Sequence, residues 1–138
     1  MSHLVLSDPS RITAGVALIT IATIEFGGTF VLRIARGKVP MTDFQKTFAR
    51  AGHGHAGMFV TLGLVCLILA DASGLTGLGG HVARLGVLIG AILLPGGFFF
   101  SSMGRDVTEP NKLIALIWLG AASVAAGVLT LGIGLLVA

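Results

Sequence analysis

Long apolar segments and short polar segments alternate along the chain. Each of the four apolar segments is long enough to cross a bilayer as a helix, which takes about 20 residues. None of them shows the two-residue alternation of apolar and polar side chains that is typical of a lipid-facing barrel strand. We therefore predict four membrane-spanning helices, at residues 12–32, 48–70, 82–103 and 113–137.

The polar segments that join the apolar ones are short, at residues 33–46, 71–81 and 104–112. Short connections favour neighbouring helices that run in opposite directions. The predicted fold class is therefore all-α. The chain is expected to form one domain over residues 1–138, an integral membrane protein built as an antiparallel up-down bundle of four transmembrane helices.

Composition strengthens the membrane interpretation. Hydrophobic residues make up 54% of the chain and charged residues 11%, with a mean hydropathy of +0.98. A soluble domain carries about 25% charged residues, so this chain has too few to cover a water-facing surface. The net charge of +3 is concentrated near the connections, so we expect no nucleic-acid partner. The expected partners are the lipid bilayer and either further copies of the chain or the other subunits of a larger membrane complex.

Basic residues are divided unequally between the two ends of the predicted bundle. One end carries Arg11 and Arg84, and the other carries Arg33, Arg36, Lys38, Lys46, Arg50, Arg105 and Lys112. By the positive-inside rule, the more basic end faces the cytoplasm. The chain is thus predicted to be a multi-pass protein of the inner cell membrane, with both termini on the outer side.

Glu25 is the residue least expected in its surroundings, because it lies within the first apolar segment. An acidic residue at the centre of a membrane helix costs about 2.5–3.5 kcal/mol on insertion scales, so it usually has a partner or a task. One interpretation is a neutral carboxyl group that is hydrogen-bonded inside the bundle. The other is a group that carries protons or binds a substrate.

Two histidines, His53 and His55, stand near the start of the second apolar segment, in the stretch RAGHGHAG at residues 50–57. Antiparallel helices place them in the same half of the membrane as Glu25, so we expect one polar site there. Arg50, Ser101 and Ser102 are candidates to join it. Residues two apart on a helix point about 200° apart, so the histidines have separate faces and do not converge on one metal ion.

Three interpretations of the histidine pair remain open. In the first, the histidines are structural residues held by hydrogen bonds. In the second, they are ligands of a haem or of a transition metal, with Glu25 as a further metal ligand. In the third, they are members of a proton relay. In its spacing, the pair resembles the H-x-H of haem–copper oxidase catalytic subunits. There, histidines two apart serve two haems on opposite sides of one helix.

Residues 25–37, EFGGTFVLRIARG, show a second local resemblance. The glutamate, followed by Gly28, Thr29, Arg33 and Gly37, is similar to the first helix of the small multidrug resistance transporters. In that family the glutamate binds protons and drug cations alternately. The resemblance implies that Glu25 has this role in a small proton-coupled transporter.

The third apolar segment is interrupted by Pro95, Gly96 and Gly97. A Pro/Gly interruption is either a simple kink or a pointer to a substrate site, because freed backbone groups can meet a ligand. In the fourth segment, small residues recur at spacings of three and four, at Gly120, Ser123, Gly127, Thr130 and Gly134. Such a stripe favours close helix contact, within the bundle or between two copies.

These features lead to a first function hypothesis and two alternatives. The first is a haem- or transition-metal-binding subunit of a membrane redox assembly, with His53 and His55 as ligands. The second is a proton-coupled transporter that uses Glu25, and the third is a structural accessory subunit without activity of its own. No catalytic residue is assigned, because no phosphate-binding loop, nucleophile elbow or cysteine pair is present.

Overall fold

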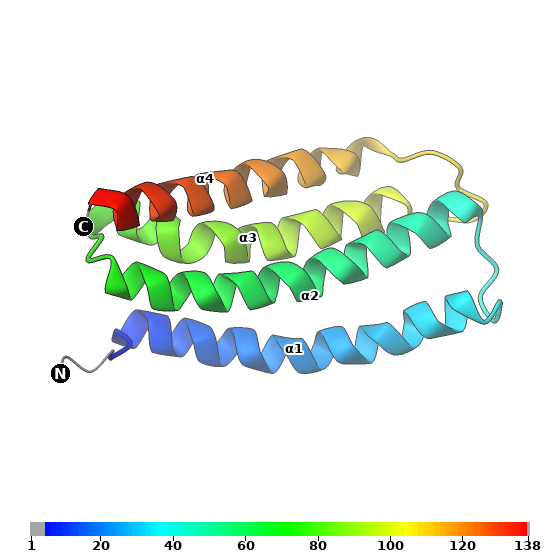
Figure 1. Cartoon of the computed structure of the whole chain (residues 1–138). Coiled ribbons are helices and arrows are strands. Elements are labelled where there is room, and N and C mark those ends of the chain that lie inside the picture. Colours follow the sequence, from blue (N-terminus) through cyan, green and yellow to red (C-terminus); the bar gives the residue numbers. More distant parts are fainter. Residues whose placement is uncertain (1–4, 138) are drawn as a thin grey trace.

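The computed structural model describes residues 5–137 and has the predicted all-helical architecture. Its helices are α1 (Asp8–Ala35), α2 (Asp43–Ala72), α3 (Gly77–Ser101) and α4 (Ala115–Val137), with a single 3₁₀ turn, η1 (Lys112–Ile114), before α4. Consecutive helices run in opposite directions, and the start of α1 lies at the same end of the molecule as the end of α4 (Figure 1). By length and composition, all four are able to cross a membrane.

Helices α1 and α2 begin before their predicted spans, at positions where polar residues cap them. Ser7 caps α1 by accepting a hydrogen bond from the Ser10 amide, and Thr42 caps α2 by accepting one from the Gln45 amide. At the start of α2 the Gln45 side-chain oxygen also accepts a hydrogen bond from the Thr42 amide, which completes a capping box. Two predicted boundaries lie outside their helices: α3 ends at Ser101, two residues before position 103, and α4 begins at Ala115, two residues after position 113, which lies in η1.

Glycines bring α3 and α4 into direct backbone contact. A Cβ atom added to Gly86 would lie 2.7 Å from the Cα atom of Gly127, and one added to Gly120 would lie 2.8 Å from the Leu94 amide nitrogen. The Ser123 hydroxyl also donates a 2.8 Å hydrogen bond to the Gly86 carbonyl. The stripe of small residues in α4 therefore serves packing within the chain, the first of the two interpretations given above.

The Pro95 segment lies in the same contact. Helix α3 continues through Pro95 to Ser101, and Pro95 is buried. A Cβ atom on Gly97 would lie 2.7 Å from the Ile117 amide nitrogen, so this glycine is needed for the close approach of α4. Gly96, by contrast, meets only the Phe100 ring, at 3.6 Å. The arrangement favours a packing role for the interruption.

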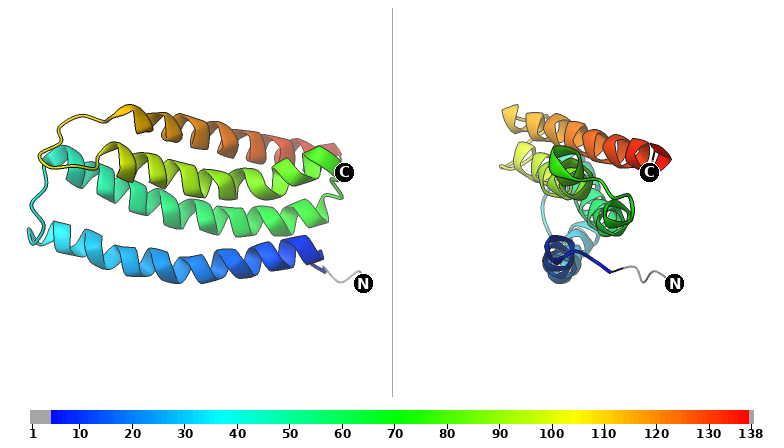
Figure 2. Two further views of the ribbon diagram at one scale, coloured as in Figure 1. Left: turned by 180° about the vertical axis from the view of Figure 1, so that it is seen from behind. Right: turned by 90° about the vertical axis from the view of Figure 1, so that its left-hand side faces the viewer.

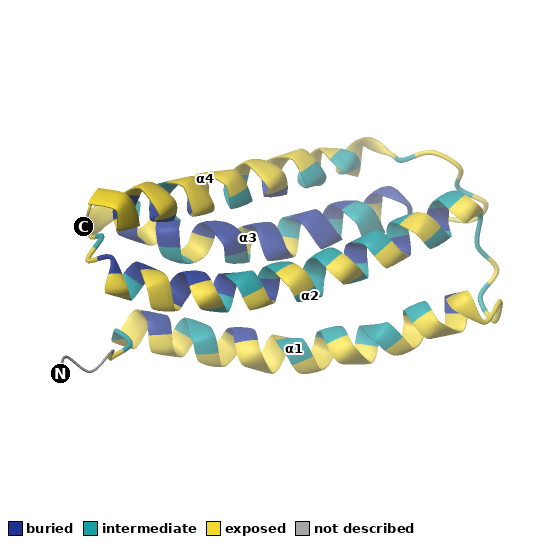
Figure 3. Ribbon diagram, in the orientation of Figure 1, coloured by how far each residue is buried: buried dark blue, intermediate teal, exposed yellow. Residues whose placement is uncertain are grey.

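Helix α1 is attached less extensively than the other three. It packs mainly along α2 (Figure 2). Its buried residues are Ser10, Ala17 and Ile34, and Ala17 shares a small core cluster with Val60 and Ala91. The main core lies instead between α2, α3 and α4. One long side of α1 is consequently exposed, as the yellow ribbon in Figure 3 shows.

Candidate functional site

His55 is held in one orientation by its own helix. Its Nδ1 atom lies 2.7 Å from the carbonyl oxygen of Ala51, one turn earlier in α2. A carbonyl oxygen only accepts hydrogen bonds, so Nδ1 carries the proton and donates it. In a neutral imidazole this leaves the lone pair on Nε2, which is the atom able to bind a metal or accept a proton.

Aromatic side chains surround the His55 ring. Its centroid lies 5.1 Å from that of Phe98 on α3 and 5.7 Å from that of Phe59 on α2. The Phe98 ring in turn meets Phe48 edge-on at 5.3 Å. These contacts restrict rotation of the imidazole, so its orientation depends on α3 as well as on α2.

His53 faces a different neighbour, helix α1. A Cβ atom added to Gly28 would lie 3.3 Å from His53 Nε2, so Gly28 leaves the space that the imidazole occupies. The half-buried ring lines a cavity of about 250 Å³. The other residues that line the cavity are Thr23, Ile24, Gly27, Phe30, Ala56 and Phe99. The predicted separation of the two histidine faces is thus what the structure shows.

The structure does not bring Glu25 to the histidines. Glu25 lies on the exposed side of α1, whereas Gly28 of the same helix meets His53. Arg50 is also exposed, on α2. Among residues 5–137, no three His, Cys, Asp or Glu side chains are grouped closely enough to hold a metal ion. Glu25 makes no hydrogen bond or ion pair with either histidine among the described residues, and the joint site of Glu25 and the histidines stays a prediction.

The two serines belong to the end of α3. The Ser102 hydroxyl donates to the Phe98 carbonyl at 2.9 Å. Ser101 is fully buried, and its hydroxyl oxygen has no hydrogen-bond partner among the described residues. Its carbonyl accepts a 2.9 Å bond from the Asn111 amide, so its backbone anchors the connection to α4.

Gln45 holds this connection in place, a role that the sequence analysis missed. Its side chain is buried, and its amide nitrogen donates to the carbonyls of Ser102 and Gly104, both at 3.0 Å. The Thr42 hydroxyl donates to the Val107 carbonyl. The spacing Thr42-x-x-Gln45 was a detectable signal, since it is that of a capping box. What the spacing did not reveal is that the same side chains also bind residues 102–107.

A second missed cluster ties three helices together at the opposite end of the molecule. Asp71 of α2 accepts bonds from Arg84 of α3, with Nη2 at 2.8 Å and Nε at 3.0 Å. Asp71 also accepts from the Ser7 amide at 2.8 Å and from the Ser10 hydroxyl at 3.0 Å. Because Asp71 neutralises Arg84 and satisfies its donors, the cluster has the chemistry of a structural clamp.

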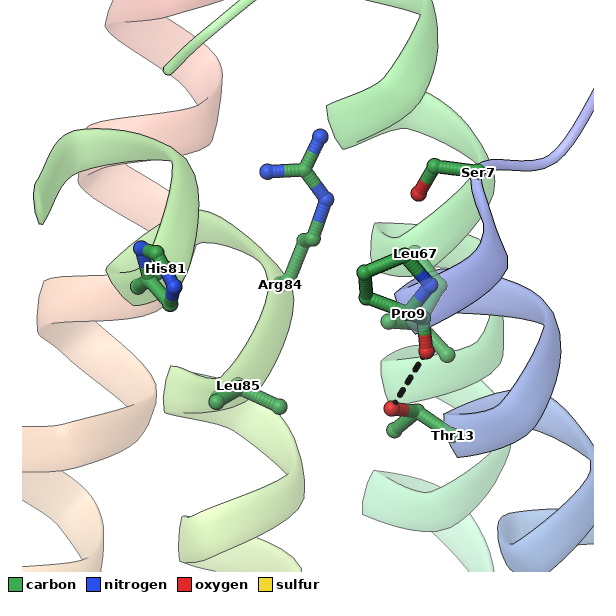
Figure 4. Close-up of a pocket in the computed structure, with 7 residues that line it drawn as sticks. All are labelled: Ser7, Pro9, Thr13, Leu67, His81, Arg84 and Leu85. Carbon is green, nitrogen blue, oxygen red and sulfur yellow. Dashed lines mark hydrogen bonds between the residues drawn. The ribbon is translucent and has the colours of Figure 1, made fainter. Parts of the chain in front are cut away.

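A cavity of about 290 Å³ opens beside this clamp. Figure 4 shows Arg84 reaching up between α3 and the start of α1, with Ser7 on the far side and His81 turned outward. The walls are formed by Ser7, Pro9, Thr13, Leu67, His81, Arg84 and Leu85. His81 bonds the Gly77 carbonyl through Nδ1 at 2.7 Å, as His55 bonds Ala51, but His81 is exposed.

Comparison of the chain with protein-family models, with curated proteins and with solved structures finds no match. The function is therefore argued from the geometry of the chain's own residues.

Proposed function

We propose that this chain is the histidine-bearing subunit of a membrane redox assembly, in which His55 supplies an axial ligand to a haem. The observation that supports this most directly is the 2.7 Å bond from His55 Nδ1 to the Ala51 carbonyl. Histidines that bind metals commonly donate their second ring nitrogen to a carbonyl or carboxylate, which fixes the tautomer and leaves Nε2 free. The rings of Phe98 and Phe59 hold the imidazole in that orientation.

The available donors favour haem over a protein-bound metal ion. A transition-metal site built from protein alone takes about three or four ligands, and residues 5–137 contain no such group. Haem brings its own equatorial ligands and takes only axial ones from the protein. One imidazole from each subunit is therefore enough.

A haem bound by His55 would need space other than the cavity at His53. The cavity at His53 measures about 250 Å³, below the roughly 300–1,000 Å³ of ordinary small-molecule sites. His53 points toward α1 and is placed to serve a second group or a proton path on that side. In this proposal the assembly lies in the inner membrane, with the basic connections in the cytoplasm and both termini outside.

The test is the absorption spectrum of the native complex, gently extracted from membranes that carry the full chain. We expect a Soret band and reduced-form bands that shift or disappear in His55→Ala. His81→Ala is the matched control, because His81 makes the same bond to its own helix at the other end of the molecule. A colourless complex with the chain present in stoichiometric amount would overturn the proposal. So would a His55→Ala complex that is folded by circular dichroism and keeps the unaltered spectrum.

A second candidate is proton-coupled transport through Glu25. The observation that favours it is the exposure of this acidic side chain in the central part of α1, where a carboxyl group is costly. In proteoliposomes Glu25→Gln is expected to abolish uptake driven by a pH gradient, and unchanged uptake would reject this candidate. If neither a spectrum nor transport is found, the third hypothesis, a structural accessory subunit, predicts that His53→Ala lowers the melting temperature without loss of any activity.

A further inference from the structure

The exposed side of α1 has a regular line of positions centred on Glu25. Seven positions, spaced alternately by three and four residues, form what we name the Glu25 seam. All seven are exposed: Gly15, Leu18, Ala22, Glu25, Thr29, Leu32 and Arg36. A mean spacing of 3.5 residues is the repeat that keeps one helix in contact with another along its length.

The Glu25 seam differs in composition from the exposed line beside it. The neighbouring line, which we name the bulky line, has a long or bulky side chain at every position except Thr23, and it is also exposed: Ile12, Val16, Ile19, Thr23, Phe26, Phe30 and Arg33. The seam instead has its small residues, Gly15, Ala22 and Thr29, at intervals of seven. Small side chains allow two membrane helices to approach closely, whereas bulky apolar ones suit contact with lipid.

Glu25 gives the seam an unsatisfied polar group. It stands about 15 Å along the helix from Gly15 and about as far from Arg36, so it lies in the middle of the seam. No hydrogen bond or ion pair joins its carboxyl group to another residue in the described part of the chain. In hydrocarbon a polar group has no water to bond, so its partner must come from outside this chain.

Symmetry indicates a second copy of the chain as that partner. Two copies inserted in the same direction and related by a two-fold axis along the membrane normal have parallel α1 helices, and each residue near the axis meets its own counterpart. Glu25 would then face Glu25. A neutral carboxyl group has one O–H donor and acceptor oxygens, so two of them satisfy each other.

Helix α4 also has exposed small residues, at Ala122, Ala125 and Gly132, but it carries no acidic residue that lacks a partner. The buried glycines of α4 already pack within the chain. A Cβ atom added to Gly127, for example, would lie 3.0 Å from the Val87 amide nitrogen of α3. Along α1, an added Cβ at Gly15 meets no atom within 4 Å, so the seam is open there.

We propose that the chain forms a two-fold homodimer through the Glu25 seam, with the two Glu25 carboxyl groups hydrogen-bonded to each other across the axis. The site at Glu25 is complete only when both copies contribute. This inference is independent of haem ligation, because His53 and His55 lie on α2, and His53 meets α1 at Gly28, which is not a position of the seam.

The first test is oxidative cross-linking of the full chain in lipid vesicles. In a Cys66→Ser background, Ala22→Cys is expected to give a disulfide-linked dimer. Ile19→Cys, from the bulky line, is the matched control and is expected to remain monomeric. Equal cross-linking from both positions, or none from Ala22→Cys, would overturn the proposal.

The second test measures the dimer dissociation constant by energy transfer between labelled chains as lipid is added. Ala22→Leu is expected to weaken the dimer at least tenfold, and Ile19→Leu to leave it unchanged. Glu25→Gln is expected to change the dissociation constant by less than about threefold, because an amide also donates and accepts hydrogen bonds. Glu25→Ala is expected to raise the dissociation constant about tenfold or more. Equal affinity of Glu25→Ala and the unaltered chain, with both folded by circular dichroism, would refute the carboxyl pairing. A chain that is monomeric at every dilution would refute the dimer itself.

Discussion

Gly86→Ala is expected to separate α3 from α4 and to destabilise the protein. The new Cβ atom would lie 2.7 Å from the Gly127 Cα atom and 2.9 Å from both the Gly127 nitrogen and the Ser123 oxygen. All three are backbone atoms, so no side chain is able to move aside. An ordinary carbon–carbon contact is about 3.5–4.0 Å, which requires the helices to move apart by roughly 1 Å.

The expected change in the free energy of unfolding combines two destabilising contributions and one stabilising contribution. Overpacking of this kind costs about 1–3 kcal/mol. Loss of the Ser123 hydrogen bond to the Gly86 carbonyl adds about 0.5–1.5 kcal/mol. Alanine is favoured over glycine within a helix by about 0.8–1.0 kcal/mol, which offsets part of the loss. We expect the free energy of unfolding to fall by about 0.5–3.5 kcal/mol.

Unfolding in mixed micelles with increasing sodium dodecyl sulfate, followed by far-ultraviolet circular dichroism, measures this change. Gly132→Ala is the matched control, because a Cβ atom there meets no atom within 4 Å and carries the same gain in helix propensity. The difference between the two variants therefore isolates the helix contact. If Gly86→Ala is as stable as Gly132→Ala, the close backbone contact described here is wrong.

Three further changes test other parts of the fold. Asp71→Ala leaves Arg84, whose side chain is 22% exposed, without its carboxylate partner, and is expected to lower the free energy of unfolding by about 3–5 kcal/mol. A loss below about 1 kcal/mol in the same unfolding assay would contradict this. Gln45→Ala removes both bonds to the 102–104 backbone and is expected to cost about 1–3 kcal/mol, with faster proteolysis of the α3–α4 connection; unchanged cleavage would exclude this role. Gly52→Ala places a Cβ 3.0 Å from the Phe99 ring. Thermal melting is expected to show it about 1–3 kcal/mol less stable than Gly54→Ala, which has open space around its Cβ and gains about 0.8–1.0 kcal/mol of helix propensity.

The four helices and their order were predictable from the sequence, because helix formation and transfer into a bilayer depend on local hydrophobicity and on the backbone's need to satisfy its own hydrogen bonds. The separation of His53 from His55 was predictable for a similar reason. Both belong to one helix, so the angle between them follows from helix geometry alone.

Only the tertiary structure decided which way each helix turns about its own axis. That rotation depends on which side chains of two helices interlock, here on contacts such as Gly86 with Gly127 and Gly28 with His53. It places Glu25 on the exposed side of α1, and it brings Asp71 and Arg84 together. The sequence by itself therefore determined how many helices form and which polar residues they carry. Packing between helices determined which of those residues meet, since a periodic pattern such as the small residues of α4 indicates that a face is packed but not which helix it meets.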